Sequence, residues 1–408
     1  MSLLAYLGHA LIMGAYMGWQ ILWALILGFG LSAIVQALIP KEKIAALLPD
    51  DSPRSIAIAT TLGAASSSCS YAAVALARTL FRKGANFNAA MAFQFASTNL
   101  VFELGLALVV ILGWRFALAE LVGGPIMIVI LVLLLRLFLT PRLLEEARQN
   151  AERGRLGRME GHAAMDMSVP ESSSPADAPA RASFWHKLRS AEALTSISHI
   201  FVMEWAAVWV DIVLGLAIAG ALAVWVPTSF WQRFFLVDHP VLSRLWGPFI
   251  GPLVAVLSFV CSVGNVPLTA VLWHGGISFG GALAFLYGDL IILPILNIYR
   301  KYYGIRVAAL LFVLFYIAMV LAALIVEYLF AALHLQPQRQ PGHMPMGEMM
   351  QPHFQWDATS ILNILFLIPA VFLTIRFFRT GGLGMLRHMD EPMDDTMHSS
   401  GDHPAHQH

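Results

Sequence analysis

Charged residues are scarce in this 408-residue chain, where Asp, Glu, Lys and Arg together make up 12% and the formal net charge is zero. Hydrophobic residues account for 58%, and the mean hydropathy is +0.70. This composition is typical of multi-span membrane proteins and excludes an ordinary soluble domain. Because there is no basic surplus, nucleic-acid binding is not expected, and the lipid bilayer is the predicted partner.

Cysteine is also nearly absent. Cys69 and Cys261 both lie in apolar stretches, which excludes a disulfide framework. The chain has no CxxC or HExxH motif and no visible nucleophile–base pair, so it is not expected to be an enzyme or to carry a cofactor. The first apolar run, Leu11–Ile39, is too long for a signal peptide and has no basic region before it. We therefore expect a multi-pass protein of the cell (plasma or inner) membrane.

Seven apolar runs have the length of about 20 residues that crossing a bilayer as a helix requires. They are Leu11–Ile39, Phe87–Leu112, Ala117–Leu139, Ile200–Val226, Phe279–Ile298, Val307–Leu333 and Thr359–Phe377. Residues 141–198 are charged and rich in Ser, Pro and Ala, which predicts a flexible cytoplasmic linker. A polar outer loop is expected at 335–358, a final span at 359–380 and a disordered tail at 381–408.

The chain repeats itself with an offset of 192 residues. Between Cys69–Phe93 and Cys261–Phe285, ten of the twenty-five aligned positions are identical. They include both cysteines and the serines that follow them, Ser70 and Ser262. This match indicates two homologous halves, at residues 1–140 and 199–334.

The centres of the repeat, Arg54–Lys83 and Leu245–His274, each have small or helix-breaking residues in the middle. If both crossed the membrane, Lys and Arg would divide almost evenly across it. If both are re-entrant and the N-terminus lies outside, 21 fall inside and four outside, namely Arg115, Arg233, Arg244 and Arg339. The positive-inside rule favours this second topology. The predicted fold is an all-α polytopic membrane protein with two inverted repeats, about seven full spans and two re-entrant Cys-Ser hairpins.

Inverted repeats with broken helices that meet near the bilayer midplane are typical of secondary transporters. Non-helical backbone at that depth must be covered by protein or line a water-filled cavity, so the hairpin tips are expected to form the substrate site. The candidate lining residues are Cys69, Ser70, Ser68, Ser67, Cys261, Ser262, Asn265 and Asn99. Two thiols suit a thiophilic species such as trivalent arsenic or Cu(I), whereas the alternative is that these small residues only pack.

Carboxylates inside apolar runs are costly and commonly functional. Asp289 lies near the middle of its run, and Glu103 lies four residues after Asn99, on one helical face with it. One or both are predicted to couple transport to protons, and the alternative is a structural hydrogen bond to a neighbouring helix. Glu204 is expected near the cytoplasmic surface, in a solvated or linker-facing position.

Methionine and histidine gather in two polar segments, one in the outer loop and one in the tail. They are His343, Met344, Met346, Met349, Met350 and His353, then His388, Met389, Met393, Met397, His398, His403, His406 and His408. We interpret both as flexible segments of biased composition. The alternative is metal capture, since Met and His suit Cu(I), and the metal would then be the cargo. No metal site is assigned.

Three motifs resemble those of a known family. They are Gly63-Ala-Ala-Ser-Ser-Ser-Cys-Ser-Tyr-Ala-Ala, Ala92-Phe-Gln-Phe-Ala-Ser-Thr-Asn99 and Cys261-Ser-Val-Gly-Asn-Val-Pro267. They resemble the bacterial predicted-permease family that includes the ArsP-type organoarsenical efflux permeases. The resemblance covers both halves but neither the linker nor the tail. It implies export of trivalent organoarsenicals, with the cysteine thiols as candidate ligands.

The sequence therefore predicts a permease that exports a small thiophilic or metalloid solute by alternating access. One alternative cargo is a copper-like metal ion. Another is an anion or small polar solute, in which case the cysteines are incidental. A membrane-embedded thiol redox enzyme is a weaker alternative. A homo-oligomer is compatible with the sequence.

Overall fold

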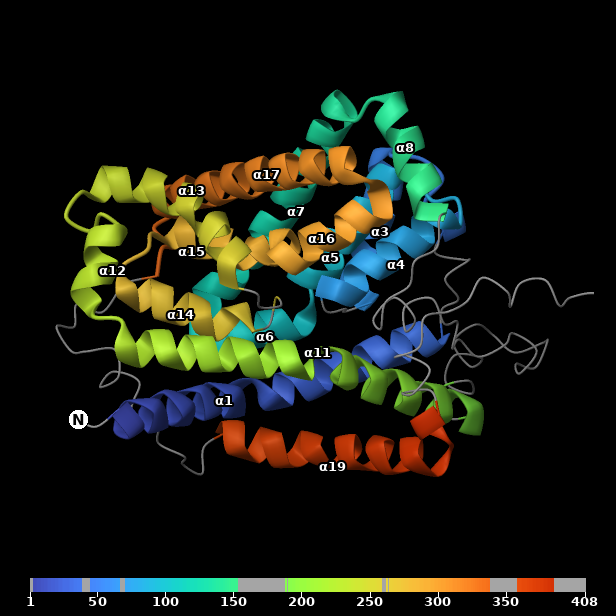
Figure 1. The fold of residues 1–408 in the computed structure, drawn as a ribbon, viewed down its shortest axis with the longest axis horizontal. Coiled ribbons are helices and arrows are strands. Elements are labelled where there is room, and N and C mark those ends of the chain that lie inside the picture. Colours follow the sequence, from blue (N-terminus) through green and yellow to red (C-terminus); the bar gives the residue numbers. More distant parts are fainter. Residues whose placement is uncertain are drawn as a thin grey trace, which may run out of the picture.

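The structure is a computed structural model that describes residues 3–38, 45–66, 70–152, 188, 190–258, 262, 264–337 and 358–384. Throughout these ranges the regular elements are helices, and the long ones run roughly side by side (Figure 1). Because apolar helices satisfy their own backbone hydrogen bonds, this is the architecture that a chain of this composition can adopt in a bilayer. The predicted all-α polytopic membrane fold is confirmed.

The first half of the chain forms α1 (Leu3–Leu38), α3 (Pro53–Ser66), α4 (Ser70–Arg82), α5 (Phe87–Asn99), α6 (Phe102–Ile111), α7 (Trp114–Phe138) and α8 (Pro141–Glu152). The second half forms α11 (Ala191–Trp225), α12 (Thr228–Phe234), α13 (Pro240–Ser258), α14 (Asn265–Gly275), α15 (Phe279–Tyr287), the 3₁₀ helix η2 (Gly288–Ile291), α16 (Leu293–Tyr303) and α17 (Ile305–Ala332). The helix α19 (Ala358–Arg379) follows.

Six helical segments in the described ranges are long and apolar enough to cross a membrane, and a seventh results if α15 to α16, bent by 42°, counts as one span. Most of them coincide with the runs found in the sequence. One difference is Pro240–Leu257 in α13, which has the length and hydropathy of a span although the sequence placed it in a hairpin. The predicted run at 200–226 coincides, except for its last residue, with part of α11, a continuous helix of 35 residues.

The backbone repeats along with the sequence. The break between α5 and α6 falls at Val101, and the break before α16 falls at Ile292, both in extended conformation. Gly113 and Gly304 then precede α7 and α17 with nearly equal dihedral angles, φ 92° and 88°. Positive φ at these turns favours glycine, so each half uses the same residue for the same turn.

The two helix pairs at the repeat centres lie toward opposite ends of the bundle. In Figure 1, α3, α4 and α8 lie toward one end, while α12, α13 and α14 lie toward the other. The residues flanking the α3–α4 pair adjoin each other, because Asn86 N donates a hydrogen bond of 2.8 Å to Leu48 O. The chain therefore enters and leaves this pair at the same end of the bundle.

Several predicted segments differ from the structure or lie beyond it. Both ends of the range 141–198 are helical, because α8 begins at Pro141 and α11 at Ala191. Arg78, which is buried, donates two hydrogen bonds of 3.2 and 2.9 Å to Ala151 O and so ties α4 to α8. The middle of the linker, nearly all of the outer loop with its Met/His cluster, and the Met/His-rich tail lie outside the described residues.

Glycine allows close contact between α3 and α5 and, in the second half, between α13 and α15. A β-carbon added to Gly63 in α3 would lie 2.4 Å from Phe93 O in α5. A β-carbon added to Gly251 in α13 would lie 2.5 Å from Gly281 O in α15. Backbone contacts of this kind are a common basis of helix association in membranes, where no hydrophobic effect drives helices together.

We therefore expect Gly63→Ala to destabilise the protein by about 1–3 kcal/mol, the usual cost of overpacking, because the new methyl group meets backbone that cannot move aside alone. The melting temperature of the purified protein in detergent measures the effect. The control is Gly105→Ala in α6, where a β-carbon would meet no atom within 4 Å. Equal melting temperatures for the two variants would contradict the tight contact of α3 with α5.

Candidate functional site

A buried polar cluster lies where helix ends from both halves converge. Ser70 Oγ, at the start of α4, donates a hydrogen bond of 2.7 Å to Asp289 Oδ2 in η2. Asn99 Nδ2, at the end of α5, approaches Asp289 Oδ1 to 3.5 Å. The backbone N of Ser262 donates to Ser70 Oγ over 3.4 Å. The structure thus brings together four of the residues singled out in the sequence, and all four are buried.

Broken helices explain why polar groups gather at this position. Helix termini leave backbone N–H and C=O groups without helical partners, and buried polar groups of this kind need hydrogen bonds. Here α4 begins at Ser70, α5 ends at Asn99, and a 3₁₀ turn holding Asp289 follows α15. Ser70 and Ser262 are equivalent in the repeat, so their hydrogen bond joins the two halves at matching positions.

The other predicted lining residues are distributed around this cluster. Asn265 is fully buried at the start of α14, and neither polar atom of its side chain has a hydrogen-bond partner within the described ranges. It therefore has both a donor and an acceptor to offer. Cys69, Ser67, Ser68 and Cys261 lie outside the described residues. In the chain, however, each cysteine directly precedes a serine of the cluster.

Glu103 lies on a different helix from Asn99, because α5 ends at Asn99 and α6 begins at Phe102. The chain breaks between them, at Val101, which is extended. Glu103 instead packs on α1, where a β-carbon added to Gly28 would lie 2.5 Å from Glu103 Cγ. The break turns Asn99 toward Asp289 and Glu103 toward the interface of α6 with α1.

Glu204 was expected in a solvated position and is instead buried. Its Oε1 accepts hydrogen bonds from Ser32 Oγ at 2.7 Å and from Gln36 Nε2 at 2.6 Å. The sequence could not show this, because burial of Glu204 depends on the close packing of α1 against α11. The three side chains form a polar link between those two helices.

Sequence analysis overlooked Glu120 in α7, although this residue also lies in an apolar run. Its side chain is 3% exposed, and neither carboxylate oxygen has a hydrogen-bond partner within the described part of the chain. The hydroxyl of Tyr287 lies against the same helix, where it would meet a β-carbon added to Gly123. The criterion that selected Asp289, a carboxylate inside a membrane run, would have found it.

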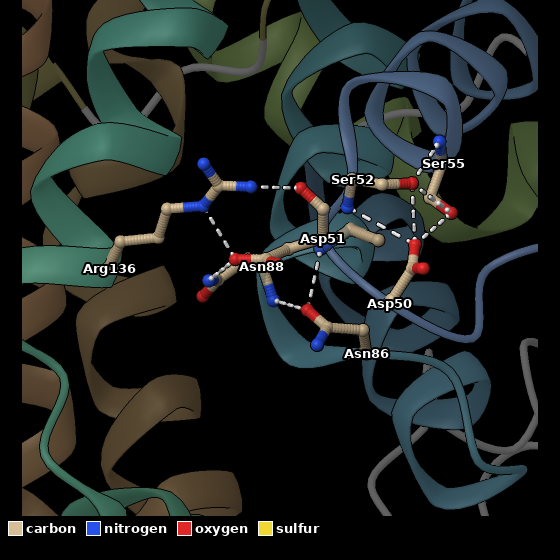
Figure 2. Close-up of polar contacts among 8 residues, drawn as sticks. Asp50, Asp51, Ser52, Ser55, Asn86, Asn88 and Arg136 are labelled. Carbon is tan, nitrogen blue, oxygen red and sulfur yellow. Dashed lines mark hydrogen bonds and ion pairs between the residues drawn. The ribbon is translucent and has the colours of Figure 1, made fainter.

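A second polar cluster lies at the end of the bundle where α3 begins (Figure 2). Asp51 Oδ2 accepts from Arg136 Nε at 2.7 Å and from Asn88 Nδ2 at 3.0 Å. Arg136 also donates to the backbone carbonyl of Asp51. The hydrogen bond from Arg136 lowers the pKa of the Asp51 carboxyl below its ordinary value. This cluster fastens the start of α3 to α5 and α7.

A matching cluster lies where α13 begins. Glu327 in α17 accepts a hydrogen bond from Gly280 N, at the start of α15, and another of 2.8 Å from Gln336 Nε2. Arg244 Nε in α13 lies 3.8 Å from Glu327 Oε1. Arg136 and Glu327 are equally far from the first residues of α7 and α17, so the two helices carry opposite charges at the same position.

The fold and the central cluster define a multi-pass membrane protein with a buried polar site between two repeated halves. A family model described as a predicted permease, of the ArsP type, matches residues 6–328. The chain is also 55% identical over 361 residues to "Putative permease Rv2963" of Mycobacterium tuberculosis (strain ATCC 25618 / H37Rv), covering 88% of this chain and 86% of that protein. No solved structure matches. The chain belongs to the predicted-permease family, which makes it a multi-pass membrane protein of the transport class.

The Asp51–Arg136 ion pair should make stability depend on pH at the acidic end. Because the pKa of Asp51 is lowered in the folded protein, the pair stabilises the fold above the unfolded pKa of about 3.9 and stops doing so as pH falls through the folded pKa. We expect acidification to remove at most about 1 kcal/mol of the free energy of unfolding through this pair, since both side chains are partly exposed.

The measurement is the melting temperature between pH 7 and pH 3. Asp51→Asn should show a smaller decrease on acidification than the unaltered protein. The control is Asp238→Asn, which removes an exposed carboxylate from the opposite end of the bundle and should leave the decrease unchanged. An identical pH profile for Asp51→Asn would rule out a contribution from this pair.

Proposed function

We propose that this permease is a secondary transporter that exports a small thiophilic solute, such as a trivalent organoarsenical, by alternating access. The central cluster is the observation that supports it. Ser70 and Ser262 come from the two halves and meet at Asp289, and each serine directly follows one of the chain's two cysteines. Thiolates are preferred ligands of soft, thiophilic species, and the oxygen atoms beside them can bind polar substituents.

The arrangement of the helix pairs supports an inverted repeat. In this proposal the α3–α4 and α13–α14 pairs are re-entrant hairpins that approach the centre from opposite ends (Figure 1). A single cavity is lined by Pro240, which begins α13, and by Gly276, which follows α14, so both ends of the second pair lie together. A site placed between two such tips can open to either side of the membrane when one half rocks against the other.

The two end clusters are suited to hold such a site closed. The Asp51–Arg136 cluster lies where one hairpin begins, and the Arg244–Glu327 cluster lies where the other begins. Alternating access requires contacts at one end to release while those at the other persist. The Asp51–Arg136 pair is partly exposed on both sides, so it contributes little net stability and can break at a small free-energy cost. In the second cluster Arg244 is partly exposed, whereas Glu327 is buried and also accepts hydrogen bonds from Gly280 N and Gln336. Export is the direction that the family resemblance implies.

A small polar or anionic solute is the second candidate cargo. The described part of the centre offers only oxygen and nitrogen atoms, from Ser70, Ser262, Asn99, Asn265 and Asp289. Neutral hydroxyl and amide groups of this kind can bind a polar solute without any thiol. In that case the two cysteines pack as small apolar residues.

Accumulation of trivalent methylarsenic in cells that lack their own arsenic exporters distinguishes these cargoes. We expect cells with the unaltered protein to hold less arsenic. Cys69→Ser combined with Cys261→Ser should return arsenic to the level of cells without the protein, because the soft ligands are gone. A control, Ser360→Ala on α19, removes a hydroxyl far from the centre in sequence and should keep export.

The amount of each variant in the membrane must be equal for this comparison. Export that persists in the double cysteine variant but fails in Ser70→Ala would favour the polar site without thiol ligands. Arsenic levels that never respond to the unaltered protein would refute the organoarsenical cargo. The same cells loaded with copper test whether the cargo is a metal ion.

A further inference from the structure

Glu120 lies in an environment that does not suit a lone negative charge. It is almost completely buried in α7, and both carboxylate oxygens lack hydrogen-bond partners within the described ranges. An ionised carboxylate in an apolar interior is strongly disfavoured unless a cation or a hydrogen-bond donor compensates it. Within the described residues, the ion pairs of Arg136, Arg244 and Arg306 are formed with other carboxylates.

The hydroxyl of Tyr287, at the end of α15, lies against the same helix as Glu120. A β-carbon added to Gly123 would lie 2.0 Å from this oxygen, so the hydroxyl rests directly on α7. Gly123 is three residues after Glu120 and thus on the same helix face. Tyr287 OH also has no hydrogen-bond partner among the described residues. Glycine at position 123 makes room for a hydroxyl beside Glu120.

Asp289 follows Tyr287 by two residues and brings a second carboxylate close enough for its charge to interact with that of Glu120. The groups facing Asp289 are Ser70 from α4, Asn99 from α5, Glu120 from α7 and Tyr299 from α16. None of these is a cation. Two buried carboxylates with no cation facing them disfavour the state in which both are ionised.

We propose that Glu120 and Asp289 form a proton-binding site that holds one exchangeable proton between them, with the Tyr287 hydroxyl beside Glu120. The site joins the substrate centre through Ser70, which donates to Asp289 and accepts from Ser262 N. Protonation of Asp289 removes the negative charge that attracts the Ser70 hydroxyl, and so alters a contact between the two halves. Coupling to cargo rests on the proposed transport function, whereas proton binding by the pair does not.

Infrared difference spectra of the purified protein between acidic and alkaline pH test proton binding directly. We expect a carbonyl band of a protonated carboxylic acid that is altered in Glu120→Gln and also in Asp289→Asn. Removing either carboxyl should displace the titration midpoint of the other. Tyr287→Phe, which keeps the ring packing, should displace the midpoint as well and serves if a carboxyl variant fails to fold.

The control is Glu204→Gln, which removes a different buried carboxyl that is bonded to Ser32 and Gln36. It should leave the midpoint of the Glu120–Asp289 band unchanged. Independent titration of Glu120 and Asp289 would overturn the proposal. A carbonyl band whose intensity depends on Na⁺ concentration at constant pH would also overturn the proposal, because the bound cation would then be Na⁺.

Proteoliposomes with an imposed pH gradient test coupling, with trivalent methylarsenic as the probe. The unaltered protein and Glu204→Gln should move the probe faster when the gradient is present. Glu120→Gln should move the probe at the same rate with and without the pH gradient. If the unaltered protein does not move the probe at all, the proposed cargo fails while the infrared result still decides the proton site. Gradient-dependent transport by Glu120→Gln would refute a coupling role for the pair.

Discussion

The hydrogen bond between Ser70 and Asp289 joins the first half of the chain to the second at the place where both halves interrupt their helices. A bilayer contains no water to satisfy free backbone groups, so helices can break at this depth only where protein supplies partners. Ser70, Asn99 and Asp289 supply side-chain polar groups beside the helix ends where the breaks occur. The remaining architecture serves to bring these helix ends together and to keep lipid away from them.

Two features of the packing allow the interrupted helix ends of the two halves to meet. Gly63 and Gly251 allow α3 and α13 to touch the helices that follow each pair, which brings the helix ends close to the bundle axis. At the ends of the bundle, the Asp51–Arg136 and Arg244–Glu327 clusters fasten the same helices to α7 and α17. The glycine contacts are apolar and buried, whereas the clusters are polar and reach the surface. The buried glycine contacts therefore lie along the helices, whereas the polar contacts that can break and re-form lie at the helix ends.

Buried carboxylates divide this protein into two polar regions with different chemistry. Glu204 Oε1 accepts hydrogen bonds from Ser32 and Gln36 and so links α1 to α11, whereas Oε2 has no hydrogen-bond partner among the described residues. Asp289 accepts hydrogen bonds from Ser70 and Asn99 of the first half, whereas Glu120 has no hydrogen-bond partner in the described part of the chain. Groups that are buried yet incompletely bonded are more readily altered by a proton or a solute.

The sequence by itself determined the membrane class, most of the helix positions and the internal repeat, because these depend on hydropathy and on local similarity. It also identified Ser70, Ser262, Asn99 and Asp289, since polar residues in apolar runs are conspicuous. Only the tertiary structure decided which of these residues meet. The break at Val101 separates Glu103 from Asn99, and the packing of α1 on α11 buries Glu204. Glu120 joins Asp289 only through the fold, because 169 residues separate them in the chain. Contacts at that separation depend on how helices pack, which hydropathy along a single segment does not specify.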